Sequence, residues 1–212
     1  MRIILSNVTK KKNEDYILNN VSITLESGKI YGLFGRNGSG KTMLLKAMAG
    51  LMPFDSGTVI CDGKVLHKDM EIIPDLGMII ENTGFWKSYT GKENLKVLAR
   101  INNRVDDSRI DEVLKIVGLE KNANKRVRRY SLGMRQRLAI AQSIMEYPSV
   151  LLLDEPTNGL DSSGVDMFRK LMKKCREDGD VILIVSHNME DVEDIIDVKF
   201  QIDSGEIVEG IK

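Results

Sequence analysis

A glycine-rich segment between two apolar stretches constrains the fold of this chain more than any other feature of its sequence. The segment reads Gly35-Arg36-Asn37-Gly38-Ser39-Gly40-Lys41-Thr42 and matches the pattern G-x-x-x-x-G-K-[ST]. The apolar run of residues 29–34 predicts a buried strand before it, and apolar residues at helical spacing over residues 42–51 predict a helix after it. Strand, glycine-rich loop and helix in this order are typical of a site that binds phosphate groups.

The residue types of this phosphate loop explain how such a site works. Glycines let backbone N–H groups close around a polyphosphate, and the following helix directs the positive end of its dipole at the same anion. We expect residues 35–42 to bind a nucleotide, with the Lys41 ammonium at the β- and γ-phosphates and the Thr42 hydroxyl on Mg²⁺. A glycine-rich turn that contains a lysine by chance is the weaker alternative, because a strand and a helix flank the motif.

Two acids follow a second apolar run. Residues 150–153 predict a strand of a parallel sheet covered on both faces, and Asp154 and Glu155 stand at its end. Enzymes that transfer phosphoryl groups with a loop of this kind hold Mg²⁺ through a carboxylate at a strand end, so Asp154 is predicted as a metal ligand. Glu155 is predicted as the general base for the attacking water. Asp154 could instead cap the following turn, but the phosphate loop upstream weakens that alternative.

Three further motifs resemble those of ABC ATPase domains. Residues 130–137, Tyr-Ser-Leu-Gly-Met-Arg-Gln-Arg, resemble the signature of the family, and residues 158–161, Asn-Gly-Leu-Asp, resemble its D-loop. Ser186-His187, after the apolar run of residues 181–185, resembles its switch histidine. With the phosphate loop and the two acids, these motifs follow the order of the family over essentially the whole chain.

The resemblance implies a mechanism in which two such domains pack head to tail. Each ATP then lies between the phosphate loop of one subunit and the signature of the other, so that ATP holds the pair together and hydrolysis releases it. Taken singly, Ser131 and Asp161 could be ordinary helix caps, and His187 a structural histidine. The resemblance assigns the residues to three groups: catalytic Glu155, His187 and Lys41; signature contacts Ser131, Gly133 and Met134; and Asp161 as a residue that couples the two sites.

The coarse pattern of the chain is an α/β core interrupted by a helical insertion. Residues 3–25 alternate in short apolar and polar pieces, which predicts strands with one wet face. Thr90 and Glu93 fit a capping box, and a further helical pattern covers residues 133–145. Between them, one helical face is formed by Ile110, Val113, Leu114 and Val117. With the resemblance, this predicts an α/β P-loop NTPase of the ABC ATPase type, with a RecA-like parallel-sheet core, an N-terminal antiparallel β lobe and a helical insertion. We expect a single domain over residues 1–212, with a core lobe at about 1–84 and 148–212 and a helical lobe at about 85–147.

The sequence departs from the family pattern in the signature and in the Q-loop. Leu132 stands where the family has a glycine, and Met134 stands where it has a glutamine. This S-L-G-M form resembles that of bacterial exporters in the antimicrobial-peptide resistance and immunity group. Glu81 replaces the glutamine of the Q-loop. We expect its carboxylate to approach Mg²⁺ or the water and to act as a coupling residue; a solvent-exposed loop acid is the alternative.

A third departure concerns the adenine base. The aromatic residue on which the family stacks the base would fall at or near Lys12, in a run of three lysines. Thr9 and Tyr16 are the candidate nucleotide contacts in this region, although the offset of Tyr16 does not match that of the family's aromatic residue. We therefore expect weak stacking of the base and little selectivity for ATP over GTP.

Composition limits the partners and the compartment. The 31 lysines and arginines balance the 31 aspartates and glutamates, so the net charge gives no case for nucleic acid as a partner. The sequence has no run near the roughly 18 apolar residues of a membrane span. Its cysteines, Cys61 and Cys175, suit buried thiols in a reducing compartment. The expected location is therefore the cytoplasm, and the resemblance to transporter subunits implies a peripheral position on the inner face of the cell membrane.

Together these features predict an ATP-hydrolysing subunit of an ABC transporter, of the exporter type, that uses ATP and Mg²⁺. Two partners are implied: a separate transmembrane permease, and a second ATPase subunit that pairs with this one when ATP is bound. Residues 81–90, with Phe85 and Trp86, are the candidate groove for the permease. Two alternatives stay open, a soluble ABC ATPase that acts on nucleic acid or ribosomes and a nucleotide-binding regulator that does not hydrolyse ATP.

Overall fold

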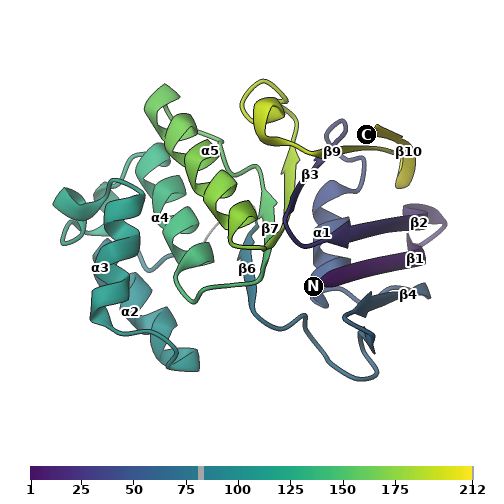
Figure 1. Cartoon of the computed structure of the whole chain (residues 1–212), viewed down its shortest axis with the longest axis horizontal. Coiled ribbons are helices and arrows are strands. Elements are labelled where there is room, and N and C mark those ends of the chain that lie inside the picture. The colour runs from purple at the N-terminus through teal and green to yellow at the C-terminus, as the bar shows by residue number, and fades with distance from the viewer. Residues whose placement is uncertain (81–83, 212) are drawn as a thin grey trace.

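The structure of the protein is a computed structural model that describes residues 1–80 and 84–211. Helices gather at one end of the molecule and antiparallel strands at the other, with a larger sheet between them (Figure 1). The metal and coupling candidate Glu81 lies outside the described residues. Within the two described ranges, every helix is too short or too polar to cross a membrane.

The centre of the described chain is a six-stranded, mostly parallel sheet. Its strands are β3 (Lys29–Phe34), β6 (Leu76–Ile79), β7 (Val150–Asp154), β8 (Val181–Ser186), β9 (Val198–Asp203) and β10 (Glu206–Ile211). The order is β10-β9-β3-β8-β7-β6, and the antiparallel pair is β9 with β10 at one edge. Every residue of β7 and β8 is buried, which explains why these two segments are continuous apolar runs in the sequence.

A second sheet of the described chain is antiparallel and has four strands. They are β1 (Arg2–Lys12), β2 (Asp15–Glu26), β4 (Ser56–Cys61) and β5 (Lys64–Val65), in the order β2-β1-β4-β5. Instead of short strands, β1 and β2 form one long hairpin of 11 and 12 residues. Its register shifts between Leu5 and Val8 and again between Val8 and Lys10. These irregularities interrupt the apolar–polar alternation, so the sequence resembles several short strands.

Helix α1 (Lys41–Ala49) packs between the two sheets. Its buried residues Leu44 and Met48 belong to an apolar cluster that also contains residues of β1, β2 and β7. On β7, Leu152 joins this cluster, whereas its neighbour Leu153 joins a second cluster on the opposite side of the sheet. Because side chains alternate between the two faces of a strand, β7 contributes to both cores. Packing on both faces holds the carboxyl end of β7 in place beside α1.

Four helices share the second apolar cluster: α2 (Gly91–Asn102), α3 (Asp107–Ile116), α4 (Leu132–Ile144) and α5 (Ser162–Glu177). Short 3₁₀ turns lie at η1 (Glu120–Asn122), η2 (Val127–Arg129) and η3 (Glu193–Ile195). The capping box is confirmed: the Thr90 hydroxyl accepts from the Glu93 N–H at 3.1 Å, and the Glu93 carboxylate accepts from the Thr90 N–H at 2.7 Å. α4 also contacts β6, which fixes the helical part of the chain to the sheet.

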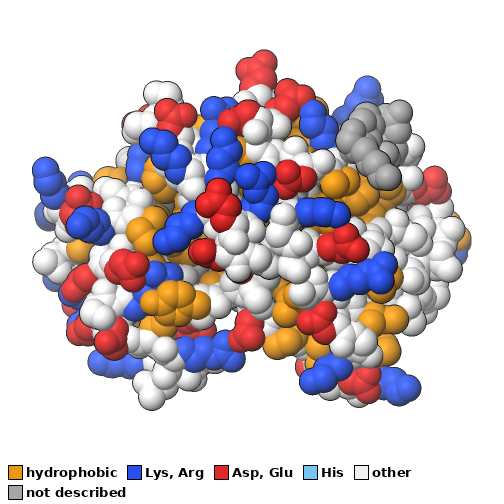
Figure 2. All heavy atoms as spheres, in the orientation of Figure 1, with side chains coloured by type: hydrophobic (Ala, Val, Ile, Leu, Met, Phe, Trp, Pro, Cys, Tyr) orange, Lys and Arg blue, Asp and Glu red, His pale blue; other side chains and the backbone are white. Residues whose placement is uncertain are grey.

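The surface mixes both signs of charge. On the face shown in Figure 2, lysine and arginine side chains alternate with aspartate and glutamate, and small apolar patches lie between them. This face differs from the continuous basic surface by which proteins hold nucleic acid backbones.

Candidate active site

The phosphate loop connects β3 to α1 and lies between β2 and β9, close to the backbone of both strands. Gly40 is the N-cap of α1, with φ at 105° and no side-chain cap hydrogen bond, so no side chain occupies the first N–H groups of the helix. A Cβ at Gly40 would lie 2.7 Å from the carbonyl oxygen of Ile17, and a Cβ at Gly35 would lie 2.3 Å from that of Ile202. Glycine is therefore required at both positions by close backbone approach.

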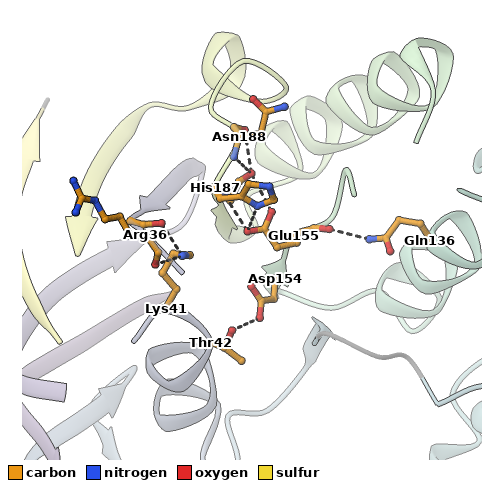
Figure 3. A network of polar contacts seen from close by, with 10 residues as sticks. Arg36, Lys41, Thr42, Gln136, Asp154, Glu155, His187 and Asn188 are labelled. Carbon is orange, nitrogen blue, oxygen red and sulfur yellow. Dashed lines mark hydrogen bonds and ion pairs between the residues drawn. The ribbon is translucent and has the colours of Figure 1, made fainter. Parts of the chain in front are cut away.

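Lys41 is buried and directs its ammonium back over the loop (Figure 3). Nζ donates to the carbonyl oxygens of Gly35 at 2.7 Å and Arg36 at 2.9 Å. A buried ammonium needs such acceptors, and phosphate oxygens are acceptors of the same kind. The Ser39 hydroxyl is also buried and has no hydrogen-bond partner among the described residues. An orphaned buried hydroxyl inside the loop fits a ligand that supplies acceptor oxygens.

The Thr42 hydroxyl donates to Oδ2 of the Asp154 carboxylate at 2.6 Å. Thr42 lies in the first turn of α1 and Asp154 is the last residue of β7, so two elements far apart in sequence converge here (Figure 3). Hydroxyl and carboxylate oxygens are the ligands that Mg²⁺ prefers, and this ion usually takes one or two protein ligands with the rest from phosphate and water. The donor set at this position therefore fits Mg²⁺.

Glu155 follows Asp154 and its carboxylate is held from the next strand, β8. His187 Nδ1 lies 2.8 Å from Oε1 of Glu155, and the His187 backbone N–H donates to the same oxygen at 2.9 Å. The Ser186 hydroxyl shares its one proton between Oε2, at 3.3 Å, and the Asn188 carbonyl oxygen, at 3.0 Å. The contact to an acceptor oxygen requires a proton on Nδ1 of the imidazole. The side chains of Glu155 and His187 are 21% and 56% exposed, so both are accessible to a ligand.

The backbone of Glu155 adopts an unusual conformation. Its φ is +48°, in the left-handed region, and Pro156 follows it. A non-glycine residue there costs about 1–3 kcal/mol, and a following proline restricts the choice further. The Glu155 N–H donates to the Val185 carbonyl at 2.8 Å, which anchors the residue to β8. Strain of this kind is retained where the surrounding structure holds a residue in a required orientation.

These groups line one open cavity of about 450 Å³. Its lining residues are Ile17, Asn37, Gly38, Gly40, Lys41, Thr42, Met43, Asp154, Glu155, Asn158 and His187. Most of the predicted loop, both acids and the histidine thus meet at one place, at the carboxyl ends of parallel strands, where ligands of α/β proteins bind. Phosphate-binding groups, metal-binding oxygens and a carboxylate base together suit hydrolysis of a nucleoside triphosphate.

The sequence of the chain matches a known protein family. The family profile described as ABC transporter matches residues 18–158, well over half of the chain. This chain belongs to the ABC transporter family.

Relatives of this ABC subunit cover nearly all of it. An uncharacterized ABC transporter ATP-binding protein of Bacillus subtilis is 42% identical, over 95% of this chain and 92% of that protein. A bacitracin transport ATP-binding protein of Enterococcus faecalis is 41% identical, over 97% and 67%. A lantibiotic transport ATP-binding protein of Streptococcus pyogenes is 36% identical, over 96% and 88%. Among solved structures, the dimeric post-hydrolysis state of an ATP-binding cassette bound to ADP and Pi has a TM-score of 0.89 at 27% identity, covering 99% of this chain and 98% of that one.

The predicted fold class and activity are confirmed. The protein is an ATP-binding subunit of an ABC transporter, it has the α/β fold of ABC ATPase domains, and it is an ATPase. The match over most of the chain, in a family of transporter subunits, gives no support to the soluble alternative.

The signature and D-loop candidates of the ABC subunit lie outside its own cavity. Among the described residues, none of Ser131, Gly133 and Met134 lines it. Ser131 caps α4, and its hydroxyl accepts from the Met134 N–H at 3.2 Å. Asp161 caps α5 and also accepts from Arg137 at 3.0 Å. Hydrogen bonds from the Gly164 N–H, the Ser163 hydroxyl and Arg137 hold the pKa of the Asp161 carboxyl below its ordinary value. The ordinary cap interpretation therefore holds for both residues, and a role toward a second subunit is compatible with it.

Neither candidate for the base region lines the cavity. The Thr9 hydroxyl accepts from the Asn20 N–H at 3.0 Å within the hairpin. Tyr16 is 47% exposed, and Lys11 Nζ lies 4.3 Å from the centre of its ring. Ile17 lines the cavity instead, because neighbouring residues of a strand point to opposite faces. The period of two in β2 was a signal in the sequence that could have identified Ile17.

Two further residues contact the proposed base without a signal in the sequence that predicts the contact. Ser186 belongs to the Ser186-His187 motif, and its hydroxyl lies 3.3 Å from Oε2 of the Glu155 carboxylate. Gln136 lies inside the signature motif, and its amide Nε2 donates to the carbonyl oxygens of Glu155 at 3.2 Å and Pro156 at 2.9 Å. No local pattern identifies these contacts, because they join segments that meet through the fold alone.

Proposed function

We propose that this subunit hydrolyses ATP with Glu155 as general base. The observation that carries the proposal is the carboxylate of Glu155 at the cavity wall, fixed by His187 and Ser186 beside the Thr42–Asp154 pair. Glu155 takes a proton from the attacking water, whose oxygen forms a bond to the γ-phosphorus. The bond from that phosphorus to the β–γ bridging oxygen breaks, and ADP and phosphate are released.

The other residues of the cavity have separate proposed roles: they bind phosphate, hold the metal ion or orient Glu155. Lys41 and the N–H groups of the loop bind the phosphate oxygens and offset the charge that develops on them. Thr42 and Asp154 would hold Mg²⁺, which neutralises charge on the β- and γ-phosphates when bound. His187 is proposed to orient Glu155 and to contact the γ-phosphate from its exposed edge. Outside the described residues, Glu81 keeps its proposed role near the metal and the water.

We propose that two subunits pair head to tail around ATP. Ser131, Gly133 and Met134 begin a helix whose N-terminal N–H groups suit a γ-phosphate, yet they lie away from the cavity of their own chain. Leu132 beside them is 54% exposed, which suits contact with another surface. The dimeric cassette among the similar solved structures supports pairing. ATP then joins the subunits, hydrolysis removes the shared contact, and Asp161 couples the two sites.

A separate transmembrane permease is the proposed second partner, which places the subunit at the inner face of the cell membrane. Phe85 is buried and therefore belongs to the core, whereas Trp86 is 46% exposed and stays a candidate contact. A depression between β6, α2 and the end of α4 adds Ile72 and Ile101, which are 50% and 73% exposed. Exposed apolar side chains around a hollow suit a docking helix from the permease.

Export is the proposed direction of transport. The S-L-G-M form of the signature and the similarity to proteins named for bacitracin and lantibiotic transport support it. A peptide antibiotic is accordingly the proposed class of cargo, selected by the permease.

The experiment that tests the pairing and the base is light scattering after size exclusion, on wild type and Glu155→Gln, with and without ATP and Mg²⁺. We expect an ATP-dependent dimer of the variant and no hydrolysis, because ATP is then trapped between the subunits. Hydrolysis by Glu155→Gln at the wild-type rate would show that another group activates the water. A variant that binds ATP, does not hydrolyse it and stays monomeric would overturn pairing of identical chains.

A further inference from the structure

The side chain of Gln136 connects the signature helix to the proposed base of the same subunit. Gln136 lies in the second turn of α4, and Figure 3 shows its amide directed at the backbone of Glu155. We propose that Gln136 is a positioning residue for ATP hydrolysis, which holds the Glu155 backbone so that the carboxylate faces the water. The inference rests on the proposed role of Glu155 as general base.

The backbone at Glu155 needs such a support. Its left-handed φ of +48° before Pro156 is a conformation that a free chain rarely adopts. On one side, the Glu155 N–H is anchored to the Val185 carbonyl of β8. On the other side, Pro156 has no N–H to donate, so the loop cannot continue the strand pairing there. The carbonyl groups of Glu155 and Pro156 are the points at which a contact from outside can fix the turn.

A glutamine amide is suited to this contact. Nε2 carries two N–H groups, and it donates to both carbonyl oxygens, at 3.2 Å and 2.9 Å. The Asn158 N–H also donates to the Glu155 carbonyl oxygen, at 3.2 Å, and thereby closes the turn from within. A residue that only accepts hydrogen bonds would repel these carbonyls, and an apolar residue would leave them with one donor fewer.

The next residue of α4 holds the far end of the same loop. Arg137 donates from Nη2 to Asp161 at 3.0 Å and from Nη1 to the Val117 carbonyl at 2.9 Å. Two consecutive side chains of one helix therefore hold the loop at residues 155–156 and at residue 161. The N-cap of this helix is Ser131, the proposed contact to the ATP of the other site. These contacts link the position of the signature helix to that of the proposed base.

The test compares steady-state ATP hydrolysis of wild type and Gln136→Met, which keeps the length of the side chain and removes its donors. We expect kcat to fall roughly tenfold to hundredfold, as for a misplaced catalytic group, while KM for ATP changes less than about twofold. Gln136→Lys restores a donor within reach of the same carbonyls and should recover at least about a third of the wild-type kcat. The control is Lys115→Met, which removes a polar side chain at an exposed position of α3 outside the cavity and should leave kcat unchanged.

A second readout separates positioning from folding. In the Glu155→Gln background, Gln136→Met should leave the ATP-driven dimer intact, because the amide acts on the base and not on binding. Unchanged kcat in Gln136→Met would overturn the proposal, and so would a loss that Gln136→Lys does not recover or that is accompanied by weaker ATP binding. If Gln136→Met does not fold, the isosteric Gln136→Glu should show the same fall in kcat. Retained hydrolysis by Glu155→Gln would instead contradict the proposed base, whatever the Gln136 variants do.

Discussion

The Thr42 hydroxyl donates to the Asp154 carboxylate at 2.6 Å and so joins the start of α1 to the end of β7. A metal ion between the loop and the strand would need both oxygens at this separation or slightly more. The Thr42–Asp154 pair can therefore be tested directly as the proposed metal site.

Thr42→Val should remove the hydroxyl proposed to bind the metal and keep the shape of the side chain. We expect kcat to fall at least about a hundredfold, because the charge on the transferred phosphoryl group is then poorly neutralised. Thr42→Ser keeps the hydroxyl and should retain most of the activity. Mg²⁺ titrations of the hydrolysis rate provide the measurement, and an unaltered Mg²⁺ dependence in Thr42→Val would exclude Thr42 as a ligand.

His187→Ala should reduce kcat by roughly tenfold or more and change KM little, because it removes one of the groups that orient the Glu155 carboxylate. Partial activity is expected to survive, since the backbone N–H of residue 187 and the Ser186 hydroxyl still hold that carboxylate. His67→Ala is the matched control, because His67 pairs with Glu71 on the surface, away from the cavity. Equal rates for both histidine variants would argue against a role of His187 in catalysis.

The base of the nucleotide is expected to contact Ile17 and not Tyr16. Ile17→Ala should raise KM for ATP about fivefold to tenfold, since roughly 1–1.4 kcal/mol of apolar contact is lost. Tyr16→Ala should change KM less than about twofold, and ATP and GTP should be hydrolysed at similar rates. Initial rates of hydrolysis of ATP and of GTP by wild type, Ile17→Ala and Tyr16→Ala measure these effects. A strong preference for ATP that disappears in Tyr16→Ala would contradict the assignment.

The stability of the protein should depend on Asp180. Burial, followed by repulsion from Asp178, raises the pKa of its carboxyl from 3.8 to about 6 in the folded chain. A raised carboxyl pKa means that the folded state binds more protons than the unfolded state between about pH 4 and pH 6, so this contribution to stability falls as pH rises through that window. Above about pH 6, Asp180→Asn should be more stable than wild type by about 1 kcal/mol, because the variant carries no charge at this partly buried position. This figure allows for the part of the side chain that water still reaches.

Thermal unfolding of the two proteins at several pH values measures this difference. The melting temperature of Asp180→Asn should exceed that of wild type by about 2–4 °C at pH 7.5. The gap should narrow toward pH 4, where the wild-type carboxyl is largely protonated in the folded state. A gap of constant size across this range would mean that the substitution acts through packing and not through the charge.

Much of the site could be predicted because its chemistry is local in sequence. The loop of residues 35–42 carries its glycines, its lysine and its helix start within a few positions, and backbone geometry alone decides their use. Asp154 and Glu155 could be predicted because an apolar run that ends in acids indicates a buried strand ending at a site. The helix caps at Thr90, Ser131 and Asp161 were equally visible, since capping links residues three positions apart.

The sequence by itself determined the strand, loop and helix of the proposed phosphate site, the acids at the strand end and the family to which the chain belongs. Tertiary structure alone decided which distant groups meet. β8 lies between β3 and β7, so Ser186 and His187 reach Glu155 from the neighbouring strand. The packing of α4 brings the Gln136 amide to the same residue. The alternation along β2 turns Ile17 into the cavity and Tyr16 out of it. Such contacts depend on sheet order, register and helix packing. Burial of the whole core sets these features, so no short segment of the sequence indicates them.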